Sequence, residues 1–411
     1  MKNFFLILLF PFLWGCQQKN ILKEPKSVSP SPIESLALRT FESLHPQLRS
    51  TLLCVKDMEN MPVGEGDTLR IANFSPGGFL LFFAQEDNVT TLGFSDNGQL
   101  HMSDTVGNPA LRMVMNNAGT LIPGLGKDDL NPGTLPSQSL YPRTIYQYRE
   151  QNKVEEYKPS VFPFLGQKAP FNKRLYNPTS GKHISVGCGP VAILGILSHY
   201  RLQGVNGVQV DWDWLFGKTE AFPEDYNVAP EFDQFAELAK RVNEHCYLIR
   251  NGSYSMCTPR QVSNLLERNG FEVNRVDYKS SEIVPYLQQN KIPVIMFGWV
   301  KGEGFLDLQA HFWIIDGLLR VDIGTYKAVV NRPEDTPNYV YEGFHESQYY
   351  VHCNWGCGGA CNGYFRYHIF NHHGRHYYDN LTRPSSLRPL SLISAKPDDY
   401  FSVSMMKITR K

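Results

Sequence analysis

The sequence predicts an α+β fold in two successive parts, a small amino-terminal domain and a larger carboxy-terminal one. The chain has 411 residues, which corresponds to two or three domains at roughly 150 residues each. Hydrophobic residues make up 42% of the chain and aromatic residues 13%, which is enough for a substantial core. In the larger part, helix-like segments come first and strand-like segments follow, an order typical of α+β proteins.

Charge and hydropathy argue against nucleic-acid binding and against a membrane-spanning helix. Forty acidic and forty basic side chains cancel, so we expect no electrostatic attraction to nucleic acid or to an anionic membrane surface. After residue 15 no apolar run approaches the length of about 18 residues that a membrane-spanning helix needs. Neither nucleic-acid binding nor a transmembrane helix is therefore expected.

The amino terminus has the pattern of an export signal. Residues 1–15 carry one basic side chain and an apolar stretch, and a small residue precedes Cys16. Residues 13–16 resemble a bacterial lipobox, in which Cys16 is lipidated, and residues 16–34 form a polar tether with several Pro and Ser residues. The lipid would attach the protein to a membrane of the bacterial cell envelope or surface without spanning it. The alternative is a plain signal peptide with a chance cysteine.

Residues 35–150 are predicted to form a small α+β accessory domain. Apolar residues at helical spacing over residues 34–44 predict a helix. Strand-like runs bounded by turn signals follow at residues 68–74, 78–84 and 90–95. The last run precedes residues 96–98, Asp-Asn-Gly, a hairpin-type turn. This region contains no arrangement of nucleophile and base, so we expect no catalysis from it.

A linker is predicted between the two parts. Residues 131–142 are rich in Pro and Ser and residues 149–156 are charged, which is typical of exposed segments that proteases cut. Residues 151–411 are long enough for one large domain. Its helices are predicted over residues 191–200, 231–243, 259–269 and 281–289. Its strands are predicted over residues 293–299, 311–318, 348–353 and 363–369.

Cys188 is the candidate nucleophile. It lies between Gly187 and Gly189, where a turn leads into a helix that is apolar on all sides and is therefore expected to be buried. Pro190 fits the first turn, where a backbone N–H would have no partner within the helix. The helix dipole would stabilise a thiolate at this position. The alternative is a core cysteine, since cysteine is commonly buried.

His311 is the candidate general base and acid. It begins an apolar strand-like run that ends in Asp316-Gly317. A histidine at the start of a strand is held rigidly and can face a cleft, which suits proton transfer. A surface histidine with satisfied hydrogen bonds is the alternative.

Two amide side chains complete the candidate site. Asn354 could accept the imidazole N–H of His311, and Trp355 beside it would shield that hydrogen bond from water. Gln167 precedes Cys188 and could donate an N–H to an oxyanion hole together with the backbone of Cys188. Taken alone, Asn354 is also compatible with an ordinary turn. The order Gln, Cys, His, Asn agrees with the papain-type pattern.

These residues resemble the streptopain-type cysteine peptidases, secreted bacterial relatives of papain. The resemblance spans about residues 35–400 and is carried by residues 166–172, 187–200, 207–212, the His311 strand and residues 354–356. It implies a papain-like two-lobed peptidase domain over residues 151–411, with a central buried helix and an antiparallel sheet or barrel. Residues 77–79 and 92–98 also resemble that family's inhibitory propeptide, which implies this role for residues 35–150.

The resemblance implies a cysteine endopeptidase that is made as a zymogen and hydrolyses peptide bonds in protein or peptide substrates. Cys188 would attack, His311 would transfer protons while Asn354 orients it, and Gln167 would stabilise the oxyanion. No metal or organic cofactor is required. Two alternatives stay open: a catalytically inactive papain-like binding lipoprotein, and a peptidase that cleaves the leaders of exported peptides.

Two departures from the family pattern concern the predicted cleft wall, which includes Trp355. Gly189 and Pro190 follow the nucleophile, where the family usually has small or aliphatic residues. This Cys-Gly-Pro sequence is the observation behind the leader-cleaving alternative. Cys357 stands where the family usually has a second tryptophan. Both departures bear on substrate preference and leave the Cys–His chemistry intact.

Three further groups of residues are assigned structural roles. Cys353, Cys357 and Cys361 are spaced by four, whereas soft-metal sites more often use Cys-x-x-Cys pairs, so a disulfide or inert thiols are expected. The His-rich residues 371–376 are expected to form a solvent loop near the cleft. Residues 211–214, Asp-Trp-Asp-Trp, are expected to pack at a helix start and not to form a carboxylate pair for acid–base work.

Overall fold

The computed structural model describes residues 30–45, 53–63, 67–85, 88–125, 142–202, 207–246, 249–251, 254–301, 308–332, 334–370 and 402–411. The predicted signal segment 1–15, the predicted lipid site Cys16 and the loop 371–376 lie outside these residues, as does most of the Pro- and Ser-rich linker. Within them, every helix is too short or too polar to cross a bilayer.

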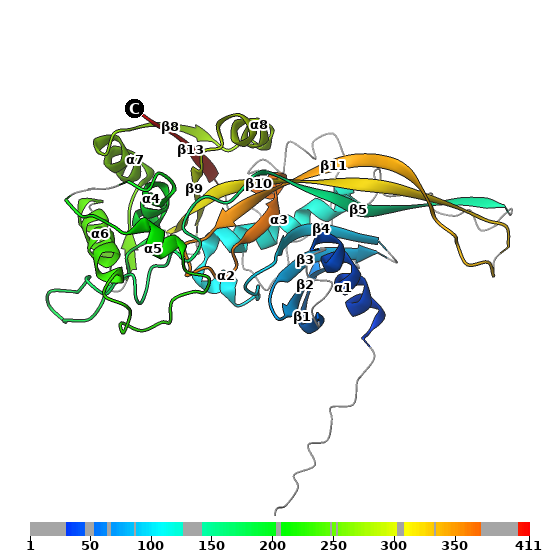
Figure 1. Cartoon of the computed structure of the whole chain (residues 1–411), viewed down its shortest axis with the longest axis horizontal. Helices are drawn as coiled ribbons and strands as arrows, with labels where there is room; N and C mark the ends of the chain where they lie inside the picture. The colour runs from blue at the N-terminus through cyan, green and yellow to red at the C-terminus, as the bar shows by residue number, and fades with distance from the viewer. Residues whose placement is uncertain are drawn as a thin grey trace, which may run out of the picture.

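One antiparallel sheet runs through both parts of the protein (Figure 1). The amino-terminal part supplies β1 (Cys54–Val63), β2 (Asp67–Ser75), β3 (Phe79–Gln85) and β4 (Asn88–Ser95). The remaining strands are β5 (Arg143–Tyr157), β8 (Phe271–Asp277), β9 (Val294–Lys301), β10 (Leu308–Val330), β11 (Val340–Asn354), β12 (Gly363–Arg366) and β13 (Ser402–Arg410). Their order is β1-β2-β3-β4-β12-β11-β10-β9-β13-β8, with β5 paired to β10. The predicted α+β class is confirmed.

The two parts of the protein meet where β4 pairs with β12. Phe94 lies opposite Tyr364, and Gly93 lies opposite Phe365. A Cβ atom on Gly93 would come within 2.7 Å of the Phe365 ring, so the absence of a side chain lets the two strands and the ring pack closely. The amino-terminal strands therefore continue the sheet of the larger domain.

Two helices of the amino-terminal part cover opposite faces of this sheet. α1 (Pro32–Leu44) begins with a capping box between Ser31 and Glu34 and packs on the face that includes Phe74. The short α2 (Asp104–Gly107) leads into α3 (Pro109–Leu125), which packs on the other face. The cores under both helices include residues of β10 and β11, so both helices are built onto the larger domain as well as onto their own strands.

The backbone does not break at the predicted boundary between residues 150 and 151, because β5 runs across it. β5 pairs with β10 from Arg143 opposite Val330 to Tyr157 opposite Leu318. With β11 these strands form a long arm that extends away from the rest of the molecule (Figure 1). The charged residues 149–156, predicted as an exposed linker, instead form an edge strand. Charged side chains are common on edge strands, since they discourage pairing with other chains.

The helices of the larger domain gather at the opposite end of the molecule from this arm (Figure 1). They are α4 (Cys188–His199), α5 (Trp212–Phe216), α6 (Phe232–His245) and α7 (Pro259–Arg268), with the two-stranded hairpin β6 (Ile249–Asn251) and β7 (Tyr254–Met256) between α6 and α7. α8 (Ser280–Asn290) and the 3₁₀ helix η2 (Tyr367–Phe370) lie nearer the sheet. The helices predicted in this domain are confirmed to within a few residues at each end.

α4 is the central helix that the sequence predicts. Residues 189–198 are all buried, and they pack against α6, α7 and the start of β10. Gly195 is needed for this packing, because a Cβ atom there would lie 2.1 Å from Ile314 of β10. α5 also confirms a prediction: Asp211 accepts the Trp214 amide at the start of the helix and Trp212 is buried, so this segment packs and does not present a carboxylate pair.

Candidate active site

Cys188 is the first residue of α4. Gly187 before it has φ +91°, a backbone conformation that favours glycine, and this turn directs the chain into the helix. The backbone amides of Phe312, Gly189 and Cys188 itself lower the pKa of the thiol, but burial raises it and has the larger effect. The amides at the helix start therefore favour the thiolate, as expected, but the effect of burial is larger and the pKa of Cys188 is raised overall.

Two further thiols lie beside the start of α4. Cys257 and Cys246 are both buried, and their mutual contact is the largest cause of the raised pKa of Cys257. A Cβ atom on Gly189 would lie 2.1 Å from the Cys257 sulfur. The glycine that departs from the family pattern is therefore explained by a neighbouring cysteine that needs its space.

His311 is buried on β10, with 3% of its surface exposed. Its Nε2 lies 3.0 Å from the carbonyl oxygen of Trp355. A carbonyl can only accept, so Nε2 carries the hydrogen in this contact. Burial lowers the pKa of His311 to about 4, and the imidazole is therefore neutral near pH 7.

Cys188 packs on one face of β10, and the His311 side chain belongs to the other face. Phe312 and Ile314 pack in the same core as α4, whereas Trp313 and Ile315 pack in the core under α3. Since successive side chains of a strand alternate between its faces, His311 shares the face of Trp313. Among the hydrogen bonds of the described residues, none joins Cys188 to His311. The predicted nucleophile and base thus lie on neighbouring elements and are not hydrogen-bonded to each other in this structure.

Asn354 is directed toward the backbone and not toward His311. Its Nδ2 donates to the carbonyl oxygen of Phe162 at 3.0 Å, and its Oδ1 accepts the amide of Gly356 at 3.1 Å. The acceptor that His311 contacts is the carbonyl of the next residue, Trp355. The predicted role of Asn354 as the partner of the imidazole is therefore not seen in this structure.

Trp355 is fully buried in the core under α3. Its indole Nε1 donates to the carbonyl oxygen of Cys361 at 2.9 Å, and its ring lies 5.8 Å from the Trp313 ring. Trp355 is next to the His311 contact, as predicted, but it does not line an open cleft here. The gap between α4 and the ends of β10 and β11 is too small to hold a water molecule.

Gln167 lies close to Cys188 along a neighbouring stretch of backbone. Its carbonyl oxygen accepts the amide of Val186 at 2.9 Å, two residues before Cys188. Its side-chain oxygen accepts from the Ser185 hydroxyl at 3.4 Å. The structure thus brings Gln167 and the start of α4 together, which the predicted oxyanion hole requires.

The other cysteines and possible metal ligands lie outside this site and are explained by packing and hydrogen bonds. Cys353 and Cys361 are buried free thiols and Cys357 is an exposed free thiol. Among the described residues, one group of possible metal ligands occurs, in the amino-terminal part: Asp57, Glu59 and His101. Hydrogen bonds account for it, because Glu59 contacts the His101 ring at 2.6 Å and Asp57 accepts from the Asn73 amide at 2.7 Å.

The functional element that the sequence analysis missed is α3. Its residues 111, 114, 115 and 118 are apolar at helical spacing, which could have revealed it. Their side chains are buried in the same core as Trp313 and Trp355, on the His311 face of β10. In addition, the Asn117 amide donates to the carbonyl oxygen of Ile369 at 2.7 Å. An amino-terminal helix thus covers part of the predicted site.

A buried helix that begins with a cysteine and packs against an antiparallel sheet bearing a histidine is the architecture of the papain-like cysteine peptidases. Residues 165–365 match the model of the Peptidase C10 family. This part of the chain, which contains Gln167, Cys188, His311 and Asn354, belongs to that family of cysteine peptidases. The predicted resemblance to streptopain-type peptidases is confirmed.

Two solved structures from Prevotella intermedia are similar to this chain. A fragment of prointerpain A is 14% identical, with a TM-score of 0.45, and the match covers 85% of this chain and 98% of the fragment. The active wild-type interpain A cysteine protease is 15% identical, with a TM-score of 0.36, and the match covers 61% of this chain and 94% of that one. No curated protein matches the chain.

Proposed function

We propose that the protein is an exported, lipid-anchored cysteine endopeptidase that is made as an inactive zymogen. The observation that carries the proposal is the position of His311, on the strand beside α4 but on the face that α3 covers. Residues 35–150 would act as the inhibitory propeptide and residues 151–411 as the peptidase domain. The amino-terminal part is then a partner of the site as well as a part of the fold.

The packing under α3 supports this latency. Met113 of α3 lies in the same core as Trp313. Gly298 of β9 pairs with His311 of β10. A Cβ atom on Gly298 would lie 3.8 Å from the Met113 sulfur, so α3 packs close to the strand position opposite His311. Release of α3 would expose this face and admit water to His311. Its pKa would then return toward the ordinary range, where an imidazole can exchange protons near neutral pH.

The active form would use the four residues predicted from the sequence. His311 would take the proton from Cys188, and the thiolate would attack the carbonyl carbon of a peptide bond. Gln167 and the Cys188 amide would donate to the oxyanion. His311 would then protonate the leaving amine, and water would hydrolyse the thioester to release the second product. This sequence of steps requires His311 to turn toward Cys188 after release of α3, and Asn354 would then orient the imidazole.

The amino-terminal sequence supports the proposed location. Cys16 would carry the lipid, and residues 17–34 would tether the protein to a membrane at the bacterial cell envelope or surface. Proteins or peptides in that compartment would be the substrates. Mass spectrometry of the protein isolated from membranes should find a diacylglycerol on an amino-terminal Cys16, and a Cys16→Ala variant should leave the membrane fraction.

The activity is tested by comparing the full chain with a chain processed in its amino-terminal part. The processed wild type should cleave a denatured protein, and a thiol-alkylating inhibitor should stop the cleavage. Cys188→Ala should abolish cleavage, because the nucleophile is lost, whereas Cys54→Ala, which removes an exposed thiol of the amino-terminal part, should process and cleave like the wild type. Full activity of Cys188→Ala would contradict the proposal.

The separation of Cys188 from His311 favours one second candidate, a catalytically inactive papain-like binding lipoprotein. In that case the amino-terminal part is permanent and the two residues never meet. The candidates differ in one measurable property. The zymogen loses residues 17–150 in part or whole during activation, while the binding protein keeps them and shows no peptidase activity after limited proteolysis.

A further inference from the structure

Residues 160–165, here called the lead-in segment, connect the end of β5 to Gln167. This segment belongs to no helix or strand, so its backbone polar groups need partners from elsewhere. Most of the partners are side chains or amides of the larger domain. Gln167 follows the segment by two residues, and its position therefore depends on how the segment is held.

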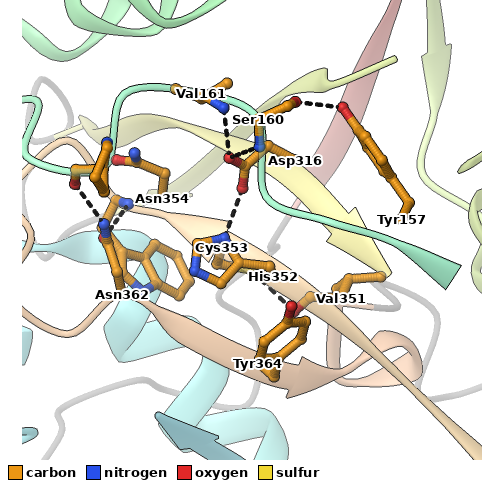
Figure 2. A network of polar contacts seen from close by, with 12 residues as sticks. Tyr157, Ser160, Val161, Asp316, Val351, His352, Cys353, Asn354, Asn362 and Tyr364 are labelled. Carbon is orange, nitrogen blue, oxygen red and sulfur yellow. Dashed lines mark hydrogen bonds and ion pairs between the residues drawn. The ribbon is translucent and has the colours of Figure 1, made fainter. Parts of the chain in front are cut away.

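Asp316 holds the first part of the lead-in segment. Its carboxylate is fully buried, and one oxygen, Oδ2, accepts the backbone amides of Ser160 at 3.2 Å and Val161 at 3.0 Å. The other oxygen, Oδ1, lies 2.6 Å from Nδ1 of His352 (Figure 2). A buried carboxylate is costly unless hydrogen bonds satisfy it, and these three donors do so.

Three polar side chains hold the next two residues. The Phe162 amide donates to the Ser198 hydroxyl at 3.0 Å, and the Phe162 carbonyl accepts from Asn354 at 3.0 Å. The Pro163 carbonyl accepts from the Asn362 amide at 2.8 Å. Figure 2 shows Asn354 and Asn362 side by side beneath this segment, with Asp316 and His352 close by. The same asparagine that the sequence assigned to His311 is thus part of this arrangement.

Two backbone hydrogen bonds hold the end of the lead-in segment and Gln167 itself. The Leu165 carbonyl accepts the Gly358 amide at 2.6 Å, and the Gln167 carbonyl accepts the Val186 amide at 2.9 Å. The segment is therefore fixed from Ser160 to Leu165, and Gln167 is fixed again next to the start of α4. Catalytic groups need placement to within about half an ångström, and supporting hydrogen bonds provide it.

We infer that Asp316 is a positioning residue for the oxyanion-stabilising group Gln167, and that Ser198, Asn354 and Asn362 share this role. This inference rests on the proposed peptidase function. Asp316 does not touch the predicted reacting atoms and acts through the lead-in segment. It lies on β10, the strand that carries His311, so one strand positions both the base and the oxyanion donor.

Ser160 also ties this arrangement to the end of β5. Its hydroxyl lies 2.5 Å from the Tyr157 hydroxyl and 2.8 Å from Nδ1 of His199 on α4. The lead-in segment therefore joins β5, α4, β10 and β11 at one place. Processing that removes residues on the carboxy-terminal side of Tyr157 would remove partners of Asp316, so the mature enzyme is expected to keep Ser160 and all that follows.

The test compares Asp316→Asn with the processed wild type on a peptide substrate. The amide variant keeps the size of the side chain but replaces one acceptor by a donor that repels the backbone N–H groups. We expect kcat to fall about 10- to 100-fold, since loss of one oxyanion donor costs roughly 100- to 1000-fold, with KM changed less than about threefold. Alkylation of Cys188 by iodoacetamide should keep its rate, because it involves the thiol and no oxyanion.

Two further comparisons separate positioning from general damage. Asp316→Asn combined with Gln167→Ala should be no slower than Gln167→Ala alone, because both changes remove the same interaction. Asp322→Asn is the control on the same strand, since this aspartate accepts from Ser347 and pairs with Arg320, and its contacts among the described residues do not include the lead-in segment. Asn362→Ala serves if Asp316→Asn does not fold, with a smaller expected loss of kcat.

The outcomes distinguish this inference from the proposed function. Two results in an active enzyme would overturn the positioning role of Asp316 and leave the peptidase assignment in place. One is that the effects of Asp316→Asn and Gln167→Ala on kcat are additive. The other is that Asp316→Asn slows the alkylation of Cys188 as much as it lowers kcat. Absence of peptidase activity in the processed wild type would overturn the proposed function, and the inference with it.

Discussion

Gly189 next to the nucleophile is explained by its neighbour and not by the substrate. The Cys257 sulfur occupies the space that a side chain at this position would need, and Cys257 itself is held by Cys246 and the core around α4. The Cys188-Gly189-Pro190 sequence is therefore compatible with ordinary papain-like chemistry. The leader-cleaving alternative, which depended on this sequence, gains no support from the packing.

Gly189→Ala is expected to destabilise the protein. The new methyl group would overlap the Cys257 sulfur, and overpacking of this kind costs about 1–3 kcal/mol, which a lower midpoint in urea unfolding would report. Gly189→Ala combined with Cys257→Ala should recover most of the loss, because the smaller side chain vacates the space. The matched control is Gly77→Ala, whose added methyl would meet only an ordinary contact at 3.9 Å. Equal stability of Gly189→Ala and the wild type would show that the α4 start moves freely.

Cys188 is expected to be unreactive in the full chain. Burial raises the pKa of its thiol, so little thiolate is present near pH 7, and iodoacetamide should alkylate it more slowly than the exposed Cys54. After processing the rate at Cys188 should rise at least tenfold, because an accessible thiol beside an imidazole has a lowered pKa. Peptide mapping of each alkylated cysteine over time measures this. A Cys188 rate equal to that of Cys54 in the full chain would contradict the closed site.

At the scale of elements, α3 and the β4–β12 pairing join the two parts of the protein. α3 covers the face of β10 that carries His311, and β4 extends the sheet through β12. Both α3 and β4 lie within residues 35–150, the predicted accessory domain. The amino-terminal part is thus packed as closely as a core element, and its release requires the disruption of a continuous sheet.

Gly93→Ala is expected to weaken this junction. The methyl group would lie 2.7 Å from the buried Phe365 ring, and the ring has little room to move within its core, so β4 and β12 should separate more easily. The full-length variant should show several-fold more peptidase activity than the full-length wild type and faster cleavage of residues 126–142 by added trypsin. Gly77→Ala is again the control. Unchanged latency would show that α3 alone keeps the site closed.

At the scale of the whole molecule, buried neutral histidines make the closed form sensitive to acid. Burial lowers the pKa of His45, at the end of α1, and of His311 to about 4 each. Both rings are buried beneath elements of the amino-terminal part or at its contact with the larger domain. Unfolding returns them to an ordinary pKa near 6.5 and binds protons, so the unfolded state gains protons relative to the folded state between pH 6.5 and 4.

Stability of the full chain should therefore fall as the pH decreases from 6.5 toward 4, by about 1.4 kcal/mol per pH unit for each histidine. Urea unfolding at pH 6.5, 5.8 and 5.0 measures this, in a range where most carboxylates remain ionised. His45→Gln should reduce the slope, whereas His245→Gln, a change at an exposed histidine, should leave it unchanged. A slope that is flat in the wild type would contradict the burial of these rings.

The local sequence was sufficient for the elements whose signals are short-range. α4 is apolar on all sides, α7 begins with a Thr258–Gln261 capping box, and the β2, β3 and β4 runs are bounded by turn residues, so helix propensity and side-chain periodicity alone predict them. The order of Gln167, Cys188, His311 and Asn354 along the chain likewise indicates the peptidase class. β5 was not predicted, because its charged residues become a strand only when β10 supplies a long-range partner.

The sequence by itself therefore determined the class of chemistry and most of the elements, since both depend on residue types and on spacing along the chain. Only the tertiary structure decided how the candidate residues meet. It put His311 on the α3 face of β10, directed Asn354 to Phe162, and assigned the buried Asp316 to the lead-in segment. These are contacts between residues far apart in the chain, and they depend on which face of a strand is buried and by what, which no local pattern specifies.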